Sequence, residues 1–156
     1  MRRAATLVVG IGNEDRGDDA VGAQVVRTLL ARWGGVVRAG VDVRALRGDA
    51  LALLDALQGY DRVVLVDATA PNGAPGTVRC FRSARALRGT TSPSTHGWSV
   101  AEALALGEAL GSLPKRVVIV GVEAENFDHG TMSSAAVRAG VEDAANTVET
   151  VLAEPA

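Results

Sequence analysis

The sequence predicts an α/β protein, a three-layer sandwich in which a mostly parallel, twisted sheet of about five strands carries helices on both faces. Two observations support this prediction. Short apolar runs typical of strands alternate along the chain with segments of helical spacing, which implies right-handed crossovers between parallel strands. The composition is 47% hydrophobic but only 3% aromatic, so Val, Leu, Ile and Ala must fill the core, as in sheets covered by helices.

The first half of the chain contains two pairs of a strand followed by a helix. Residues 5–12 (ATLVVGIG) form a short β-branched run, typical of a strand buried on both faces. Apolar residues spaced by four over residues 21–29 predict an amphipathic helix that ends at Gly34. The alternation of residues 41–46 predicts a half-covered or edge strand, and residues 49–59 have helical spacing up to a glycine.

The second half contains three further strands and two helices. Residues 62–68 (RVVLVDA) form the clearest central strand, and the alternating residues 77–81 predict an outer or antiparallel strand. A capping-box pattern of serine and glutamate predicts a helix over residues 99–110. Residues 116–123 form another buried strand, and residues 133–152 have the spacing of a final helix begun by one of two adjacent serines.

Length and charge limit the possible functions. The 156 residues are expected to form one domain, 1–156, with residues 152–156 as a loose tail. The 16 basic and 18 acidic residues are spread along the chain, and a net charge of −2 argues against binding to nucleic acid or a membrane surface. A single cysteine, Cys80, excludes an internal disulfide framework and fits a reducing compartment. No apolar run reaches the ~20 residues of a membrane span. We expect a cytoplasmic protein, by default a monomer, and the charge balance favours a small ligand or another protein as its partner.

The stretch GIGNEDRGDDAVG (residues 10–22) resembles a phosphate-binding turn but has the wrong charge. Asp15 replaces the third glycine of the dinucleotide fingerprint, and the four carboxylates within residues 14–19 would repel a pyrophosphate. No Walker sequence follows the turn. Asp18 is a natural N-cap and Asp19 lies in the first helical turn, where carboxylates interact favourably with the helix dipole. Capping needs only one of the two, which leaves the other free for a ligand.

Two further polar residues are expected near this turn. Asp67 ends a central parallel strand, so its carboxylate emerges at the carboxyl edge of the sheet, where open α/β sheets bind ligands. His96 lies on a loop before a helix and could reach the same edge, although a surface or helix-start histidine would have the same sequence context. Two carboxylates and one imidazole from three loops would form a divalent-metal site with open coordination positions.

These residues give the chain a resemblance to the hydrogenase maturation endopeptidases. The similarity runs from VVGIGN through APNGAPGTV to VVIVGVEAEN, and the order and spacing of these stretches carry it. The resemblance implies that Asp19, Asp67 and His96 bind the metal, with Asp18 as the alternative to Asp19 because many relatives have one glutamate there.

The resemblance also implies the reaction and the partner. In this family the nickel arrives already bound to cysteine thiolates of the [NiFe]-hydrogenase large-subunit precursor, and the protease removes the C-terminal peptide in one cut. The implied activity is therefore that of an aspartic-type, nickel-dependent endopeptidase, with nickel delivered by the substrate protein. Residues that supply oxygen and nitrogen donors, but too few for a closed site, suit a metal that brings its own sulfur ligands.

Other functions are weighed against this one. A module that holds nickel or the precursor without cutting would use the same residues, and a Rossmann-like nucleotide-binding enzyme is the third alternative. The chain has neither the His-Glu-x-x-His helix of zinc proteases nor the Gly-x-Ser-x-Gly turn of serine hydrolases. Cys80 is interpreted as a packed strand residue rather than a nucleophile. His129 follows a strand and could line the same crevice.

Overall fold

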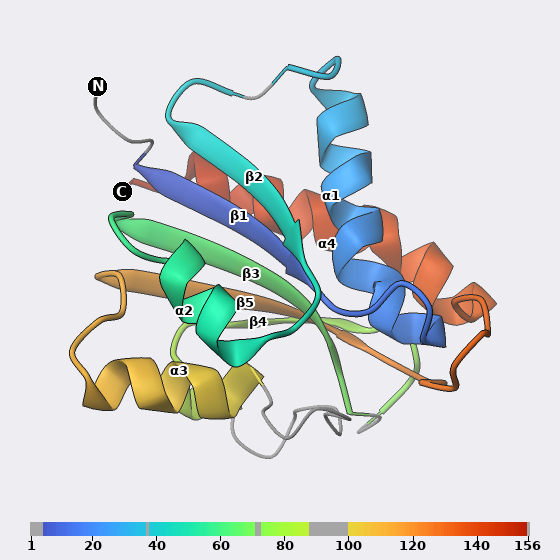
Figure 1. The fold of residues 1–156 in the computed structure, drawn as a ribbon. Helices are drawn as coiled ribbons and strands as arrows, with labels where there is room; N and C mark the ends of the chain where they lie inside the picture. The colour runs from blue at the N-terminus through green and yellow to red at the C-terminus, as the bar shows by residue number, and fades with distance from the viewer. Residues whose placement is uncertain (1–4, 37, 71–72, 88–99, 156) are drawn as a thin grey trace.

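One twisted sheet organises the chain (Figure 1). The computed structural model describes residues 5–36, 38–70, 73–87 and 100–155, and within these ranges five strands lie in the order β2-β1-β3-β5-β4. The strands are β1 (Thr6–Ile11), β2 (Val41–Leu46), β3 (Arg62–Thr69), β4 (Val78–Phe81) and β5 (Arg116–Glu123). All neighbouring pairs are parallel except β4 and β5, which are antiparallel. The predicted edge strand and the predicted antiparallel outer strand are thus confirmed as β2 and β4.

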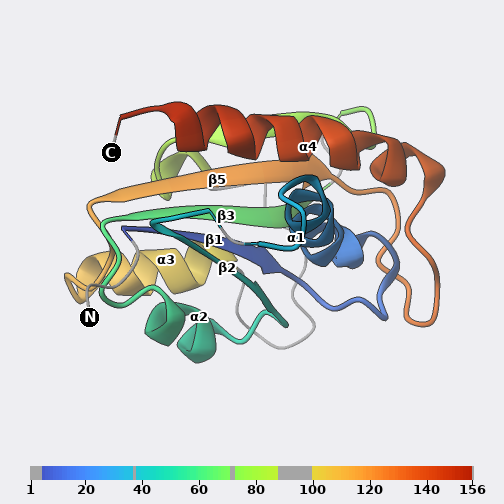
Figure 2. The same ribbon diagram turned by 90° about the horizontal axis from the view of Figure 1, so that it is seen from above.

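Helices cover both faces of the sheet, as predicted (Figure 2). The helices are α1 (Val21–Arg32), α2 (Ala50–Ala56), α3 (Val100–Ala109) and α4 (Ala135–Ala153), with short 3-10 turns η1 (Gly17–Ala20) and η2 (Arg85–Leu87). One face of the sheet packs against α1 and α4, and the other against α2 and α3. No helix among the described residues has both the length and the apolar character needed to cross a bilayer.

The core is divided by the sheet into two apolar clusters. Successive residues of a strand point to opposite faces, so Val64 and Val66 of β3 join the cluster under α1 and α4 while Val63 and Leu65 join the cluster under α2 and α3. The three central strands are buried at nearly every position, and β2 and β4 are only partly buried. The continuous apolar runs in the sequence therefore correspond to central strands, and the alternating runs correspond to strands at the edges of the same sheet.

Two helices begin at the residues that the sequence indicates. The Asp49 carboxylate accepts hydrogen bonds from the backbone N–H groups of Leu51 (2.8 Å) and Ala52 (3.1 Å), which fixes the start of α2. Ser134 is the N-cap of α4, and its hydroxyl accepts from the N–H of Val137 at 3.4 Å. Ser99, the other half of the predicted capping box before α3, lies outside the described residues.

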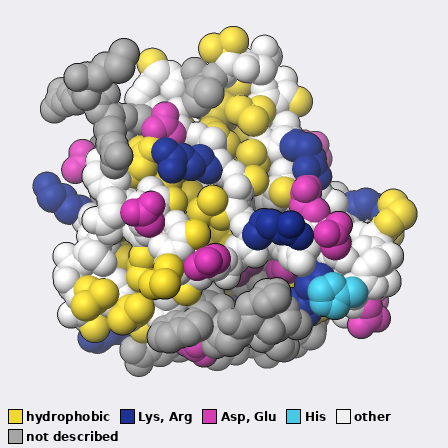
Figure 3. Space-filling view, viewed as in Figure 1, with side chains coloured by type: hydrophobic (Ala, Val, Ile, Leu, Met, Phe, Trp, Pro, Cys, Tyr) yellow, Lys and Arg dark blue, Asp and Glu magenta, His cyan; other side chains and the backbone are white. Residues whose placement is uncertain are grey.

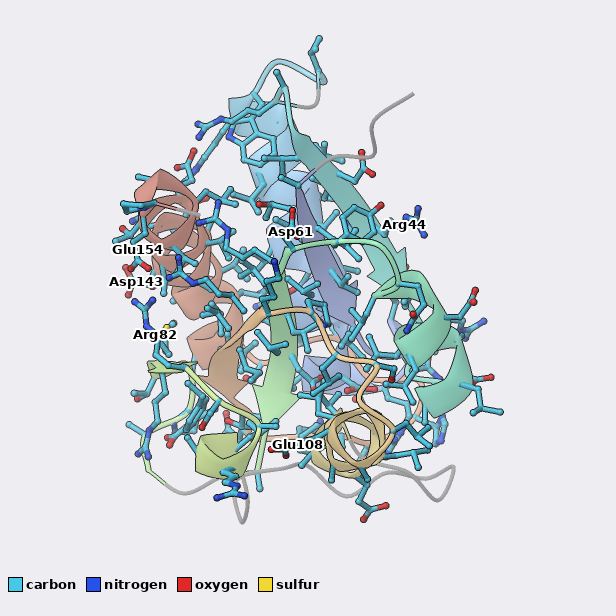
Figure 4. All side chains as sticks on the ribbon, turned by 90° about the vertical axis from the view of Figure 1, so that its left-hand side faces the viewer. Arg44, Asp61, Arg82, Glu108, Asp143 and Glu154 are labelled. Atoms are coloured by element: carbon cyan, nitrogen blue, oxygen red, sulfur yellow. The ribbon has the colours of Figure 1, made fainter. Side chains whose placement is uncertain are left out.

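The expected loose tail is wrong for residues 152–155. Helix α4 continues through Ala153, and the buried guanidinium of Arg62 donates to the carbonyl oxygens of Val151 (3.1 Å) and Glu154 (3.0 Å). The Glu154 carboxylate in turn accepts two hydrogen bonds of 2.6 Å from Arg82, which lies beside it in Figure 4. The guanidinium of Arg62 thus binds carbonyl oxygens at the end of α4, where the helix dipole favours positive charge. This end of the chain is therefore held against the sheet.

Candidate active site

The turn between β1 and α1 lies at the carboxyl edge of the sheet, and its glycines allow close packing. A Cβ atom added to Gly10 would lie 2.2 Å from the carbonyl oxygen of Gly22, so strand and helix backbones touch there. Gly12, with φ of 140°, approaches the backbone of Asp19 so closely that a Cβ would lie 2.0 Å from its carbonyl oxygen. Because no side chain fits at these positions, the glycines bring the start of the helix onto the sheet. Their presence therefore needs no bound phosphate.

Asp18 is fully used by the protein itself. It is 0% exposed, and its Oδ2 accepts hydrogen bonds from the backbone N–H groups of Glu125 (2.7 Å) and Asn126 (2.8 Å). Ser134 donates twice, from its N–H to Oδ1 (2.6 Å) and from its hydroxyl to Oδ2 (3.1 Å). The Asp18 carboxylate therefore fastens η1 to the loop between β5 and α4 and has little capacity left for a ligand.

The prediction that Asp18 caps the helix following it is wrong. Helix α1 is preceded by η1, its N-cap is Ala20, and no side chain makes a capping hydrogen bond there. The physical reason is that the Asp18 carboxylate points to four donors on a segment more than 100 residues away in sequence. It thus supports the start of α4 instead of the start of α1.

Asp19 differs from its neighbour in having unused oxygen capacity. It is partly buried, and its Oδ2 accepts one hydrogen bond, from the backbone N–H of Asn13 at 2.8 Å. Burial raises the pKa of the Asp19 carboxyl, and the Asn13 hydrogen bond and the positive charge of Arg16 only partly oppose this. Of the two adjacent aspartates, Asp19 is therefore the one that can offer oxygens to a ligand.

Asp67 lies near the end of β3 and faces the same edge. Burial raises the pKa of the Asp67 carboxyl well above its ordinary value of 3.8, the nearby negative charge of Asp19 raises it further, and a hydrogen bond with the Ala68 backbone lowers it. The structure thus brings together two of the carboxylates that the sequence singled out. Two partly buried carboxylates that repel one another favour a cation between them.

The third predicted ligand, His96, lies outside the described residues. Within the described ranges, no group of three or more His, Cys, Asp and Glu side chains is arranged to hold a metal ion. The structure does describe the residues on either side of the segment that contains His96. These residues, Leu87 and Val100, both belong to the apolar cluster under α2 and α3. The metal-binding role of Asp19, Asp67 and His96 stays a prediction.

The raised pKa of Asp67 predicts a distinctive pH dependence of stability. A carboxyl whose pKa is higher in the folded than in the unfolded protein destabilises the fold when it ionises, and this effect disappears as the pH falls toward 3.8. We therefore expect Asp67→Asn to have a higher Tm than the wild type at pH 8, with a difference that narrows as the pH is lowered to 4. Thermal unfolding followed by circular dichroism measures the Tm of the wild type and of the variant at each pH. A wild type more stable than the variant at pH 8 would contradict this assignment.

An ion pair between a buried glutamate and an exposed arginine at this edge was not predicted from the sequence. Glu123 ends β5 and is 1% exposed, and its Oε1 lies 2.9 Å from a guanidinium nitrogen of Arg79 on β4. Neither carboxylate oxygen has a hydrogen bond of good geometry among the described residues. Residue alternation places Glu123 on the same face as Asp67, toward α2 and α3. One sequence signal could have revealed Glu123. Like Asp67, it is a charged residue near the end of an otherwise apolar, buried strand.

A cleft of about 590 Å³ opens beside the acidic turn. Asn13 forms part of one side, the loop between β2 and α2 contributes Arg47 and Gly48, and Leu51 and Leu106 add apolar surface. This volume lies within the range of small-ligand sites, roughly 300 to 1,000 Å³. The sequence contained no pattern that located the cleft, because its walls, as far as the structure describes the chain, come from three separate segments.

The remaining reactive side chains are more peripheral. Cys80 lies on β4 as predicted, but it is exposed rather than packed. Partial burial nonetheless raises the pKa of its thiol, which disfavours the thiolate that a nucleophile needs. His129 is exposed in the loop between β5 and α4, and the next residue, Gly130, donates its N–H to the Asp15 carbonyl oxygen at 2.7 Å. His129 therefore lies next to the acidic turn without being enclosed in it.

The mostly parallel sheet, the close-packed β1–α1 turn and the two neighbouring carboxylates define an α/β fold whose sheet edge carries negative charge, where a nucleotide-binding turn would have to accept a phosphate. The chain belongs to the hydrogenase maturation protease family, because the HycI model of that family matches residues 48–151. The resemblance seen in the sequence is thus confirmed, and the chain is a peptidase of hydrogenase maturation.

Individual relatives agree with this assignment. The Hydrogenase 2 maturation protease of Escherichia coli is 27% identical over 150 residues, which are 95% of this chain and 90% of the relative. The hydrogenase expression/formation protein HupD of Thiocapsa roseopersicina is 30% identical over 124 residues, which are 78% of this chain but only 55% of that longer protein. The solved structure of the hydrogenase maturating endopeptidase HybD from E. coli superposes with a TM-score of 0.76 at 27% identity, covering 94% of this chain and 91% of the other.

Proposed function

We propose that this protein removes the C-terminal peptide from the large-subunit precursor of a [NiFe]-hydrogenase that has already bound nickel. The family supplies the reaction class, and one solved relative, from Thermococcus kodakarensis, is described as a [NiFe] hydrogenase maturation protease. The observation that carries the proposal for the site is the pair of Asp19 and Asp67, two partly buried carboxylates from different segments at one sheet edge. We infer that the reaction takes place in the cytoplasm, in keeping with the single cysteine.

The nickel is part of the substrate in this proposal. Asp19 and Asp67 offer oxygen donors and His96 offers a nitrogen donor, so the three residues complete the coordination of an ion that already carries thiolate ligands. A divalent ion between the two carboxylates replaces their mutual repulsion with attraction, which lowers the pKa of both. Without a metal ion, the two carboxyl groups resist ionisation. A site of this kind is therefore well suited to bind an incoming cation.

Recognition of the metal would position the peptide bond. Once the precursor's nickel is held at the acidic edge, the polypeptide next to its cysteine ligands is confined there as well, and this confinement raises the effective concentration of the scissile bond at the site. Hydrolysis then consumes one water molecule. Its hydroxyl group joins the acyl carbon, the C–N bond breaks, and a proton passes to the departing amine.

The test is direct processing of a purified precursor. The wild-type protein is mixed with a nickel-loaded large-subunit precursor, and mass spectrometry follows the intact mass of the large subunit. We expect a single loss equal to the C-terminal peptide. A large subunit that stays bound to this protein but keeps its full mass would instead support a non-cutting, chaperone-like module. Saturable binding of a nucleotide, unchanged in Asp67→Asn, would support the nucleotide-binding alternative.

A further inference from the structure

Asn13 links the cleft beside the acidic turn to the candidate site. Asn13 lines the cleft, and its backbone N–H donates to the Asp19 carboxylate at 2.8 Å. A second hollow of about 250 Å³, lined in part by Gly12 and Glu14, shares Arg47 with the first. The two hollows therefore flank the same arginine and follow the acidic turn. A chain lying in the first hollow would contact Asn13, whose backbone N–H binds the Asp19 carboxylate.

Among the described residues, the walls of the cleft offer an apolar surface and the cation of Arg47. Leu51, on the first turn of α2, is an apolar side chain that is 72% exposed. Leu106 of α3 adds to the same apolar surface. The Asp49 carboxylate is already occupied by the start of α2. Figure 3 shows hydrophobic side chains gathered over α3, while Lys, Arg, Asp and Glu are interspersed over the rest of that face.

Arg47 is held only loosely. Its guanidinium donates to Asn13 Oδ1 at 3.3 Å and lies 3.4 Å from Asp15 Oδ2, and both charged side chains are about three-quarters exposed, at 76% and 78%. Exposed ion pairs of this kind contribute only about 0 to 1 kcal/mol. The arginine can therefore exchange these partners for a carbonyl or carboxylate oxygen of a ligand at little cost.

We propose that this cleft binds the segment of the precursor polypeptide next to the scissile bond, a proposal that rests on the proposed function. The segment binds in an extended form, with an apolar side chain against Leu51 and Leu106 and a carbonyl or carboxylate oxygen on Arg47. The peptide and the metal would then be recognised by adjoining surfaces.

The test compares variants of the cleft with matched variants elsewhere. Leu51→Asp and Arg47→Glu are each expected to raise the KM for processing of the nickel-loaded precursor about tenfold while kcat stays within about twofold, because they remove contacts made equally before and during the reaction. Leu110→Asp, at another leucine that is 67% exposed, and Arg85→Glu, at another exposed arginine, should leave both constants unchanged. All four positions lie at the surface, and an aspartate in the first turn of α2 is favourable for the helix.

The outcomes separate the two proposals. If the wild type shortens the precursor and the cleft variants retain its KM, the cleft proposal is wrong and the proposed function stands. The cleft proposal is also wrong if Leu110→Asp and Arg85→Glu raise KM as much as the cleft variants do. The effect would then come from surface charge in general. If the wild type leaves every nickel-loaded precursor intact, the proposed function fails and the cleft proposal fails with it. Sedimentation of the wild type as a dimer that the cleft variants abolish would instead assign the cleft to a second copy of the chain.

Discussion

Replacing Asp18 with alanine should lower the free energy of unfolding by about 3–4 kcal/mol, a large loss for a domain of this size. The substitution leaves the partly buried N–H groups of Glu125, Asn126 and Ser134 without their acceptor. It also removes the connection between η1 and the start of α4. Urea unfolding followed by tryptophan fluorescence and analysed by linear extrapolation measures the loss.

The neighbouring aspartate is the control for this prediction. Asp19→Asn should change the free energy of unfolding little or raise it, because burial already disfavours the charge of Asp19 in the folded protein. Of the two adjacent aspartates, only Asp18 should therefore be needed for stability. An Asp18→Ala variant as stable as the wild type would show that the four hydrogen bonds of Asp18 do not hold the loop in place.

The second large effect should be on activity. Asp67→Asn is expected to reduce kcat/KM for processing of the nickel-loaded precursor at least about 100-fold, because loss of a metal ligand should exceed the 10- to 100-fold effect typical of residues behind the ligands. The fold should remain intact, since the variant keeps the shape of the side chain. Processing is measured from the intact mass of the large subunit over time.

A matched control lies at the other end of the same strand. Asp61 directly precedes β3 and is exposed, and Figure 4 shows it at the start of the strand, opposite the arrowhead. Asp61→Asn removes the same charge without reaching the carboxyl edge, so it should process the precursor at the wild-type rate. Equal losses in both variants would trace the effect to net charge and not to the site.

The sequence predicted the fold because its signals are local. The apolar run of β3 and the alternation of β2 record burial on two faces or on one, and the Asp49 cap lies next to the helix that it starts. The position of Asp67 followed from topology alone, because a residue ending a central parallel strand must lie at the carboxyl edge. The pairing of Asp67 with the acidic turn was predictable for that reason.

The features that sequence reasoning missed all depend on distant contacts. Asp18 has the sequence context of an N-cap, yet its partners lie more than 100 residues away, and no local pattern announces them. The ion pair of Arg79 and Glu123 joins two antiparallel neighbours whose register only the folded sheet defines. The cleft at Arg47 likewise forms only when three segments converge. Asp18 and Asp19 could therefore be recognised as a pair from the sequence, but only the fold separates their roles.

We propose that the edge formed by Asp19 and Asp67 binds the nickel carried by the precursor. Nickel K-edge X-ray absorption of the precursor, frozen rapidly after mixing with this protein, tests it most directly. With the wild type, oxygen or nitrogen ligands should appear beside the sulfur ligands of the precursor's nickel before the peptide is released, and with Asp67→Asn this change should be reduced. A nickel spectrum identical in the precursor alone and in both mixtures would contradict the claim.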